Sequence, residues 1–176
     1  MKIGLAAWII QDGNYPDFAV GDVRRFALEF HAQPFSVSDS GVAACVHRKN
    51  CVYDITARIT FKKEDLTVID FGHFAYSEQK IAADVGAWIS GQLFIGVDPF
   101  MYFETWERQA GVPQIKSDWR IDRILLETTP LIEEKPRYFV KDERRFAEIE
   151  VGRTNAWDDD KGNGSYALEC TEIKPA

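Results

Sequence analysis

Asp70 and His73 are the residues whose types and spacing come nearest to a catalytic pair, in the segment Asp70-Phe71-Gly72-His73. A carboxylate and an imidazole close together can act in general acid–base catalysis when their surroundings shift the pKa of the proton-transferring group. No G-x-S-x-G nucleophile motif accompanies the pair, and the glycine-rich and catalytic loops that accompany Asp-Phe-Gly in protein kinases are missing. The simpler interpretation is a strand that ends in an exposed turn.

Cys45, His47 and Cys51 form a C-x-H-x3-C pattern that raises the question of zinc. A tetrahedral site needs a fourth ligand and usually has closer paired spacings. Cys51 also falls among the apolar positions of its expected strand, where a buried thiol behaves as a small hydrophobic side chain. No metal site is predicted from this pattern.

The acidic segment DDDKGNG, residues 158–164, invites comparison with a calcium-binding loop. An EF-hand loop needs oxygen ligands at set positions, a glycine at the sixth and a glutamate at the twelfth. Counting from Asp158 puts Gly162 at a ligand position, and counting from Asp159 puts Cys170 at the twelfth. Neither frame works, so the segment is predicted to be the turn of a hairpin. The fold is predicted to need no metal and no cofactor.

The segment from Gln11 to Asp22 combines turn-forming residues with two aromatic side chains. Loops that leave a rigid sheet commonly carry function, and aromatic anchors surrounded by polar groups are typical of interface hot spots. This loop is therefore predicted to be a recognition surface, with the alternative that its aromatic residues fold back and plug the core. The candidate binding residues are Asp12, Asn14, Tyr15, Asp17 and Phe18.

A β-hairpin over Cys51 to Gly72 is the strongest structural pattern in the chain. Apolar and polar residues alternate with period two, which predicts a strand with one buried face. The polar tip KKED separates this strand from a second apolar run. The side chains expected in the core are Cys51, Tyr53, Ile55, Ala57, Ile59 and Phe61.

Other strands are expected on either side of this hairpin. A weak strand is expected within Phe35 to His47, and one short helix between Ser77 and Gly86, with Ser77 as its cap. Residues 130–136 are expected to be a connection, and KDERR is expected to be a charged turn or a single helical turn. Residues 146–157 are expected to pair with 165–173 as a C-terminal hairpin. The remaining expected strands are Lys2–Ile10, Val23–Ala32, 85–97, Phe100–Trp106 and Trp119–Thr129.

Many short strands separated by turn signals predict an all-β fold. Glycines inside strands, Gly91 among them, favour an antiparallel, partly closed barrel over a sandwich, because bends and bulges let a sheet curl. At 176 residues, without repeats or linkers, the chain is expected to form a single domain over residues 1–176.

The composition limits the classes of partner. The formal charge of −7 opposes binding to nucleic acid or to an anionic membrane surface. Three cysteines and the absence of an export signal suggest reduced thiols in the cytoplasm. We therefore expect a binding module for a protein partner. The alternative is a small-molecule-binding protein or enzyme with its site at the barrel mouth, near Asp70 and His73.

Overall fold

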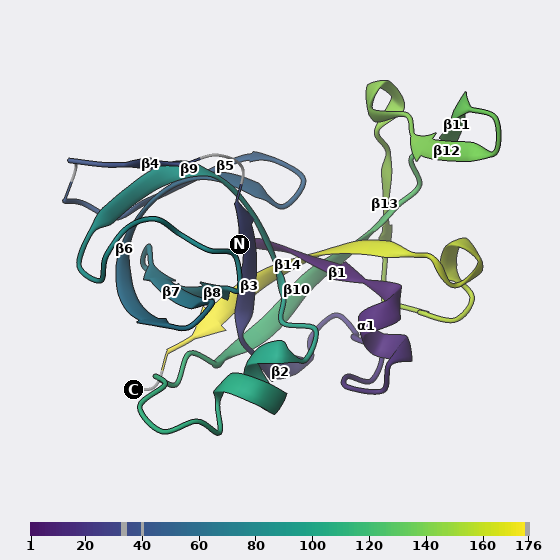
Figure 1. Ribbon diagram of the computed structural model, residues 1–176. Helices are drawn as coiled ribbons and strands as arrows, with labels where there is room; N and C mark the ends of the chain where they lie inside the picture. Colours follow the sequence, from purple (N-terminus) through teal and green to yellow (C-terminus); the bar gives the residue numbers. More distant parts are fainter. Residues whose placement is uncertain (33–34, 40, 175–176) are drawn as a thin grey trace.

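Five strands close into a barrel in the computed structural model, which describes residues 1–32, 35–39 and 41–174 (Figure 1). Strand β9 pairs with both β3 and β6, and this double pairing closes the ring β9-β3-β8-β7-β6. The predicted all-β barrel is confirmed, although it is mixed, because β3 and β8 run parallel. Its strands are β3 (Leu28–Ala32), β6 (Val52–Lys63), β7 (Leu66–Asp70), β8 (Phe74–Ser77) and β9 (Trp88–Val97).

The predicted central hairpin is confirmed as β6 and β7. On β6 the inward residues Tyr53, Ile55, Ala57 and Ile59 are buried, and their neighbours in sequence are more exposed. Strand β7 departs from the expected alternation, because Leu66 to Ile69 are all buried. Its second face packs against a separate apolar cluster that includes Tyr76 and Tyr102, so both faces of this strand are covered.

A side sheet extends from the barrel through strand β1 (Lys2–Ala6). Strand β1 pairs in parallel with β9 and antiparallel with β14 (Ser165–Ile173), which in turn pairs with β10 (Ser117–Glu127). The two halves of β10 then pair with β2 (Val23–Phe26) and β13 (Glu148–Val151). The main apolar core is formed by buried side chains of this side sheet together with the inward-facing side chains of the barrel.

The predicted C-terminal hairpin is wrong. Strands β13 and β14 do not pair with each other, because β10 lies between them and bonds to both. Ile124 of β10 pairs with Val151 of β13 on one edge and with Leu168 of β14 on the other, so the backbone of β10 bonds to both strands. The segment between them folds as a 3₁₀ turn over Asp159–Gly162 instead of a hairpin tip.

Parts of two predicted strands are helical turns, although the strand expected over Lys2–Ile10 is present over Lys2–Ala6. Residues Ala7–Gln11 form helix α1, because Ala7, Ile9 and Ile10 all turn inward, which is impossible for adjacent residues of one alternating strand. The predicted strand Phe100–Trp106 contains a single π-helical turn, Tyr102–Trp106. The Asp98 carboxylate accepts hydrogen bonds from the backbone N–H groups of Tyr102 and Phe103 and fixes the start of this turn.

The predicted short helix between Ser77 and Gly86 is also wrong. Ser77 ends β8, and its hydroxyl accepts the backbone N–H of Gln79 at 3.1 Å. The carbonyls of Ile81 and Ala83 accept hydrogen bonds from the Lys62 amine at 2.7 and 2.8 Å. A helix over this segment would need the Ile81 carbonyl for its own bond to the N–H four residues later, so the Lys62 contact there favours the irregular path of bends and a turn.

The remaining elements lie at the edges. The weak strand expected over Phe35 to His47 is two strands, β4 (Ser36–Val37) and β5 (Ala44–Lys49), and residue 40 lies outside the described part. The expected strand Val23–Ala32 is divided at Ala27 into β2 and β3. The segment expected as a connection is a hairpin of β11 (Leu131–Lys135) and β12 (Tyr138–Lys141). A 3₁₀ turn, Glu143–Arg145, follows it, as the charged segment predicted.

Candidate functional site

A groove lies on the outer face of the side sheet, and strand β1 forms its floor. Ile3 and Leu5 of β1 point into the core, so Gly4 faces outward beside Gly96 of β9, its partner in the register. The ring of Phe94 lies over this pair. A Cβ atom on Gly4 would come within 2.3 Å of the Phe94 Cζ atom, so only glycine leaves room for the ring.

The groove has a volume of about 290 Å³. It is lined by strands β1, β3, β9 and β14, helix α1, the β5–β6 turn and the ends of β10 and β13. Small-molecule pockets usually occupy about 300–1,000 Å³, so this one suits a single small group. Three aromatic side chains on its lining are partly open to solvent: Trp8 at 49%, Phe94 at 38% and Phe146 at 40% exposure. The groove therefore offers aromatic surface that no other part of the chain covers among the described residues.

The charged side chains on the groove lining are Glu29, Glu127, Glu148 and His31. No Lys or Arg belongs to the lining formed by the described residues. Glu29 lies 3.2 Å from His31 Nε2, and this hydrogen bond raises the pKa of the imidazole above its usual value, against the opposing effect of burial. The lining is therefore richer in negative than in positive charge.

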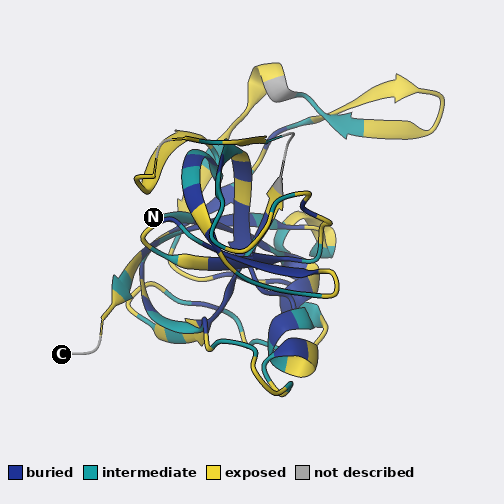
Figure 2. Ribbon diagram, turned by 60° about the vertical axis from the view of Figure 1, so that its left-hand side comes forward, coloured by how far each residue is buried: buried dark blue, intermediate teal, exposed yellow. Residues whose placement is uncertain are grey.

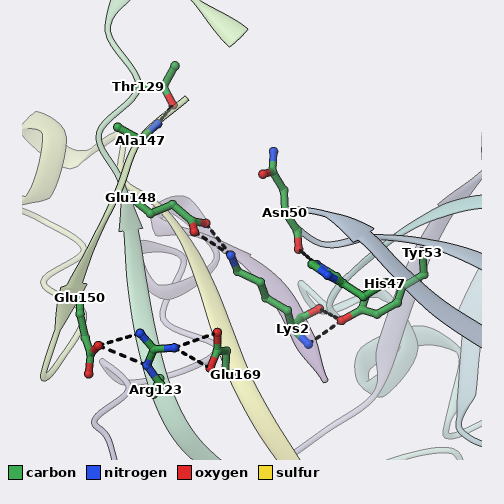
Figure 3. Close-up of polar contacts among 10 residues, drawn as sticks. All are labelled: Lys2, His47, Asn50, Tyr53, Arg123, Thr129, Ala147, Glu148, Glu150 and Glu169. Atoms are coloured by element: carbon green, nitrogen blue, oxygen red, sulfur yellow. Dashed lines mark hydrogen bonds and ion pairs between the residues drawn. The ribbon is translucent and has the colours of Figure 1, made fainter. Parts of the chain in front are cut away.

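Two lysines that do not line the groove form ion pairs with the other two carboxylates, Glu148 and Glu127. Figure 3 shows the Lys2 side chain reaching Glu148, where its amine donates to both carboxylate oxygens at 2.9 and 2.7 Å. The Lys2 backbone also exchanges hydrogen bonds with the Tyr53 hydroxyl, which ties β1 to the barrel. The Lys141 amine donates to Glu127 at 2.7 Å. These contacts fix the positions of both carboxylates.

A second hollow of about 330 Å³ continues the groove, since the two share Asn50, Glu127 and Phe146. It adds Lys49, and it adds Thr129 and Lys141, which stand at the base of the β11–β12 hairpin. The hairpin, residues 131–141, is called the arm from here on. The groove thus leads from helix α1 to the base of the arm.

The arm projects away from the rest of the chain (Figure 1) and is exposed along most of its length (Figure 2). Its two strands pair only with each other within the described residues. Four large apolar side chains on it are between 40% and 59% exposed. They are Leu131, Ile132, Tyr138 and Phe139. An isolated two-stranded hairpin is at best marginally stable in water, so this arm displays apolar surface without a cover.

The predicted recognition loop, Gln11 to Asp22, is anchored to the protein instead of standing free. Phe18 is completely buried in the main core, and Tyr15 packs against that core. The Tyr15 hydroxyl donates to the Asp98 backbone carbonyl at 3.0 Å, and burial raises its pKa well above the usual value. This packing agrees with the alternative prediction, in which the aromatic residues close the core. Phe18 offers no surface to a partner.

The polar residues of this loop also make internal contacts. The Asp17 carboxylate accepts the Thr154 hydroxyl at 2.8 Å and the Ala156 backbone N–H at 3.1 Å. The Asn14 amide donates to the Pro99 carbonyl at 3.3 Å. Asp12 is exposed to solvent. Two of the three predicted hydrogen-bonding side chains thus hold the loop in place.

Asp70 and His73 do not form the predicted pair. The Asp70 carboxylate accepts the Gly72 backbone N–H at 2.9 Å within its own turn. His73 Nδ1 lies 2.8 Å from the Glu172 carboxylate of β14, and its ring centre is 5.5 Å from that of Trp119. His73 and Glu172 line an open hollow of about 740 Å³. Glu172 could not be predicted from the sequence as a partner of His73, because it lies in an ordinary alternating strand.

The cysteines do not form a metal site with their neighbours. Among residues 1–32, 35–39 and 41–174, no three His, Cys, Asp or Glu side chains gather in a way that could hold a metal ion. Cys45 is exposed, and Cys51 is buried against Leu125 and Ala167. Burial raises the pKa of the Cys51 thiol to about 12, which keeps it protonated at neutral pH.

Comparisons with other proteins suggest no function for this chain, so its function is inferred from the geometry of the groove and the arm. No protein-family model, no curated protein and no solved structure matches this chain. In the described part of the chain, no helix has the length and apolar character needed to cross a bilayer.

Proposed function

We propose that this protein is a protein-binding module that holds a partner chain on the arm and in the groove at the arm's base. The observation that carries the proposal is the group of four exposed apolar side chains on a hairpin that packs against no other strand of the described chain. Leu131 and Phe139 lie on one face of the hairpin and Ile132 and Tyr138 on the other, because adjacent residues of a strand face opposite sides. Large apolar side chains exposed in this way mark interaction sites. Covering it gains about 25 cal/mol for each Å² removed from water, so a partner that covers the arm gains affinity.

A partner of opposite charge fits better than a second copy of this chain. Two copies, each with a formal charge of −7, repel each other at long range, whereas a basic partner is attracted and its association is accelerated. The Glu29 carboxylate on the groove lining acts in the same direction at short range, whereas Lys2 and Lys141 neutralise Glu148 and Glu127. The proposed partner is therefore a protein with a basic segment flanked by apolar residues.

The arm can be removed without cutting through the core. The backbone N–H of Asp142 donates to the Pro130 carbonyl at 2.8 Å, so the two ends of the arm already lie side by side. A variant in which a short Gly-Ser turn replaces residues 131–141 should fold like the parent protein. A subtler variant replaces the four exposed apolar residues by Ser or Thr and keeps Lys141, whose amine bonds to Glu127.

The test begins with affinity capture from the host. Captured proteins are identified and purified, and their affinity for the parent chain and for both arm variants is then measured. The proposal expects a basic partner whose affinity falls at least tenfold in both variants, because several buried apolar contacts are lost. A Val85→Ser variant is the control, since Val85 is exposed but far from the arm in sequence and absent from the groove lining.

Two results would contradict the proposal. One is a partner whose affinity is the same for the parent chain and the arm variants. The other is a stable dimer of this chain in sedimentation experiments that both arm variants abolish, because the arm would then join two copies of the same protein.

A second candidate function is a small-molecule site at His73. The specific observation is the 2.8 Å contact between His73 and Glu172 at the edge of an open hollow. A carboxylate that orients an imidazole is a common arrangement in general acid–base sites. Asp70 contributes to this candidate only by shaping the turn. A His73→Gln variant that loses binding of a ligand found by screening, with unchanged partner affinity, would favour this function over the first.

A further inference from the structure

We infer that the groove receives a guanidinium group, presented by an arginine side chain of the partner. The inference rests on the proposed function for the source of that arginine, whereas the chemistry of the groove can be tested with a small molecule alone. It identifies the feature of a partner that the groove would recognise.

The charges on the groove lining select a cation. Glu29, Glu127 and Glu148 line it, and no Lys or Arg does so among the described residues. Lys2 and Lys141 neutralise two of these carboxylates from outside. Each ionised carboxylate has about four sites for hydrogen-bond donors, so acceptor capacity remains. The Glu29 carboxylate lies 3.2 Å from the His31 imidazole, and it also interacts electrostatically with Tyr76 and Asp98.

The aromatic residues favour guanidinium over ammonium. Trp8, Phe94 and Phe146 expose part of their rings on the groove lining. A guanidinium group is planar and weakly hydrated, so it stacks on aromatic rings while its N–H groups donate to carboxylates. The ammonium group of lysine is more strongly hydrated and interacts as a point charge. Carboxylates placed among aromatic rings therefore match arginine more closely.

The size and position of the groove fit one side chain of a longer polypeptide. Its volume of about 290 Å³ is small for an independent ligand site. It opens through the second hollow to Thr129 and Lys141 at the base of the arm. An arginine inserted in the groove would thus leave its own backbone near the arm, where apolar neighbours in the partner can cover Leu131 and Phe139.

The test uses Nα-acetyl-L-arginine methylamide as the probe and the citrulline compound, its uncharged counterpart of nearly the same shape, as the control. Both are titrated into the full chain and followed by backbone amide and tryptophan indole NMR signals. We expect the arginine probe to bind at least about tenfold more tightly, which one charge-assisted hydrogen bond would produce. The signals that shift should belong to Gly4, Gly96 and the Trp8 indole.

Matched variants locate the binding site. Glu29→Gln keeps the shape of the side chain and should weaken the arginine probe about tenfold. Trp8→Leu, at an exposed position, should also weaken it. Glu64→Gln removes the same charge from the exposed β6–β7 turn and should change nothing. Circular dichroism and thermal unfolding confirm that each variant is folded.

The outcomes of these experiments distinguish a failure of the guanidinium site from a failure of the proposed function. Equal binding of the arginine and citrulline probes, or equal losses in Glu29→Gln and Glu64→Gln, would overturn the guanidinium site. If the probe fails while the arm variants still lose a partner, only this inference is wrong. If the probe binds as expected while partner affinity does not depend on the arm, the groove chemistry stands and the proposed function fails.

Discussion

Replacing Phe18 by Ala tests whether the loop over residues 11–22 closes the core or recognises a partner. The Phe18 side chain is completely buried. Its ring centre lies 5.8 Å from that of Tyr15 and 6.3 Å from that of Phe26, and the Arg24 guanidinium carbon lies 5.9 Å from it. The hydrogen bond from its backbone N–H to the Thr154 hydroxyl would survive the substitution. The cost should therefore come from lost packing alone.

The expected loss is about 3–5 kcal/mol in the free energy of unfolding, the usual range for a buried Phe replaced by Ala. Burial of the aromatic side chain accounts for roughly 1.5–3 kcal/mol, and the cavity left behind adds the rest. For a chain of this length, each kcal/mol lowers the thermal midpoint by about 2–4 °C. The midpoint should thus fall by roughly 6–20 °C.

Urea unfolding followed by tryptophan fluorescence measures this change, with the slope checked to be the same as in the parent chain. Val20→Ala is the control, because Val20 lies in the same loop but is exposed. It should change the free energy of unfolding by less than about 0.5 kcal/mol. A loss below about 1 kcal/mol for Phe18→Ala, or equal losses for both variants, would refute the packing argument and restore the recognition loop.

Two further predictions concern ionisable groups. Asp98→Ala should cost about 3 kcal/mol or more in unfolding experiments, because it leaves the buried Tyr76 hydroxyl and the Tyr102 N–H without an acceptor, whereas Asp98→Asn should cost less. Glu29 holds the pKa of His31 above 6.5, so protonated His31 stabilises the fold at low pH, and this contribution is lost as the pH rises through the raised pKa. An NMR titration should give a lower His31 midpoint in Glu29→Gln. An unchanged midpoint would contradict the assigned pair.

The central hairpin could be predicted because its information is local. Alternation along Val52 to Lys63, a polar tip and a second apolar run all lie within about twenty residues. Five of the six side chains expected in the core are buried, and Phe61 is only partly buried because the register shifts between Ile59 and Phe61. The barrel class followed from repeating this pattern along the chain. Even here the full burial of β7 escaped prediction, because its second face is covered by Tyr76 and Tyr102 from elsewhere in the sequence.

Elements fixed by distant contacts could not be predicted. The segment after Ser77 was predicted to be a helix but follows a path of bends whose carbonyls accept hydrogen bonds from Lys62. The segment after Pro99 was predicted to be a strand but forms a helical turn whose first N–H groups bond to Asp98. The C-terminal hairpin failed because β10, which precedes both strands, pairs with each of them. In each case a partner outside the local segment made the alternative structure more stable.

The groove was harder still to predict, because its parts become neighbours only when β1 lies against β9. Glycine inside a strand costs roughly 0.5–1 kcal/mol relative to alanine, so Gly4 and Gly96 side by side weaken the sheet locally. Phe94 explains this cost, since its ring occupies the space above both glycines and still leaves part of its surface exposed. The same strand buries Ile3 and Leu5 on its other face. Strand β1 therefore supplies core packing on one face. Its other face is the floor below the Phe94 ring, whose centre lies 6.2 Å from that of His31, the imidazole that contacts Glu29.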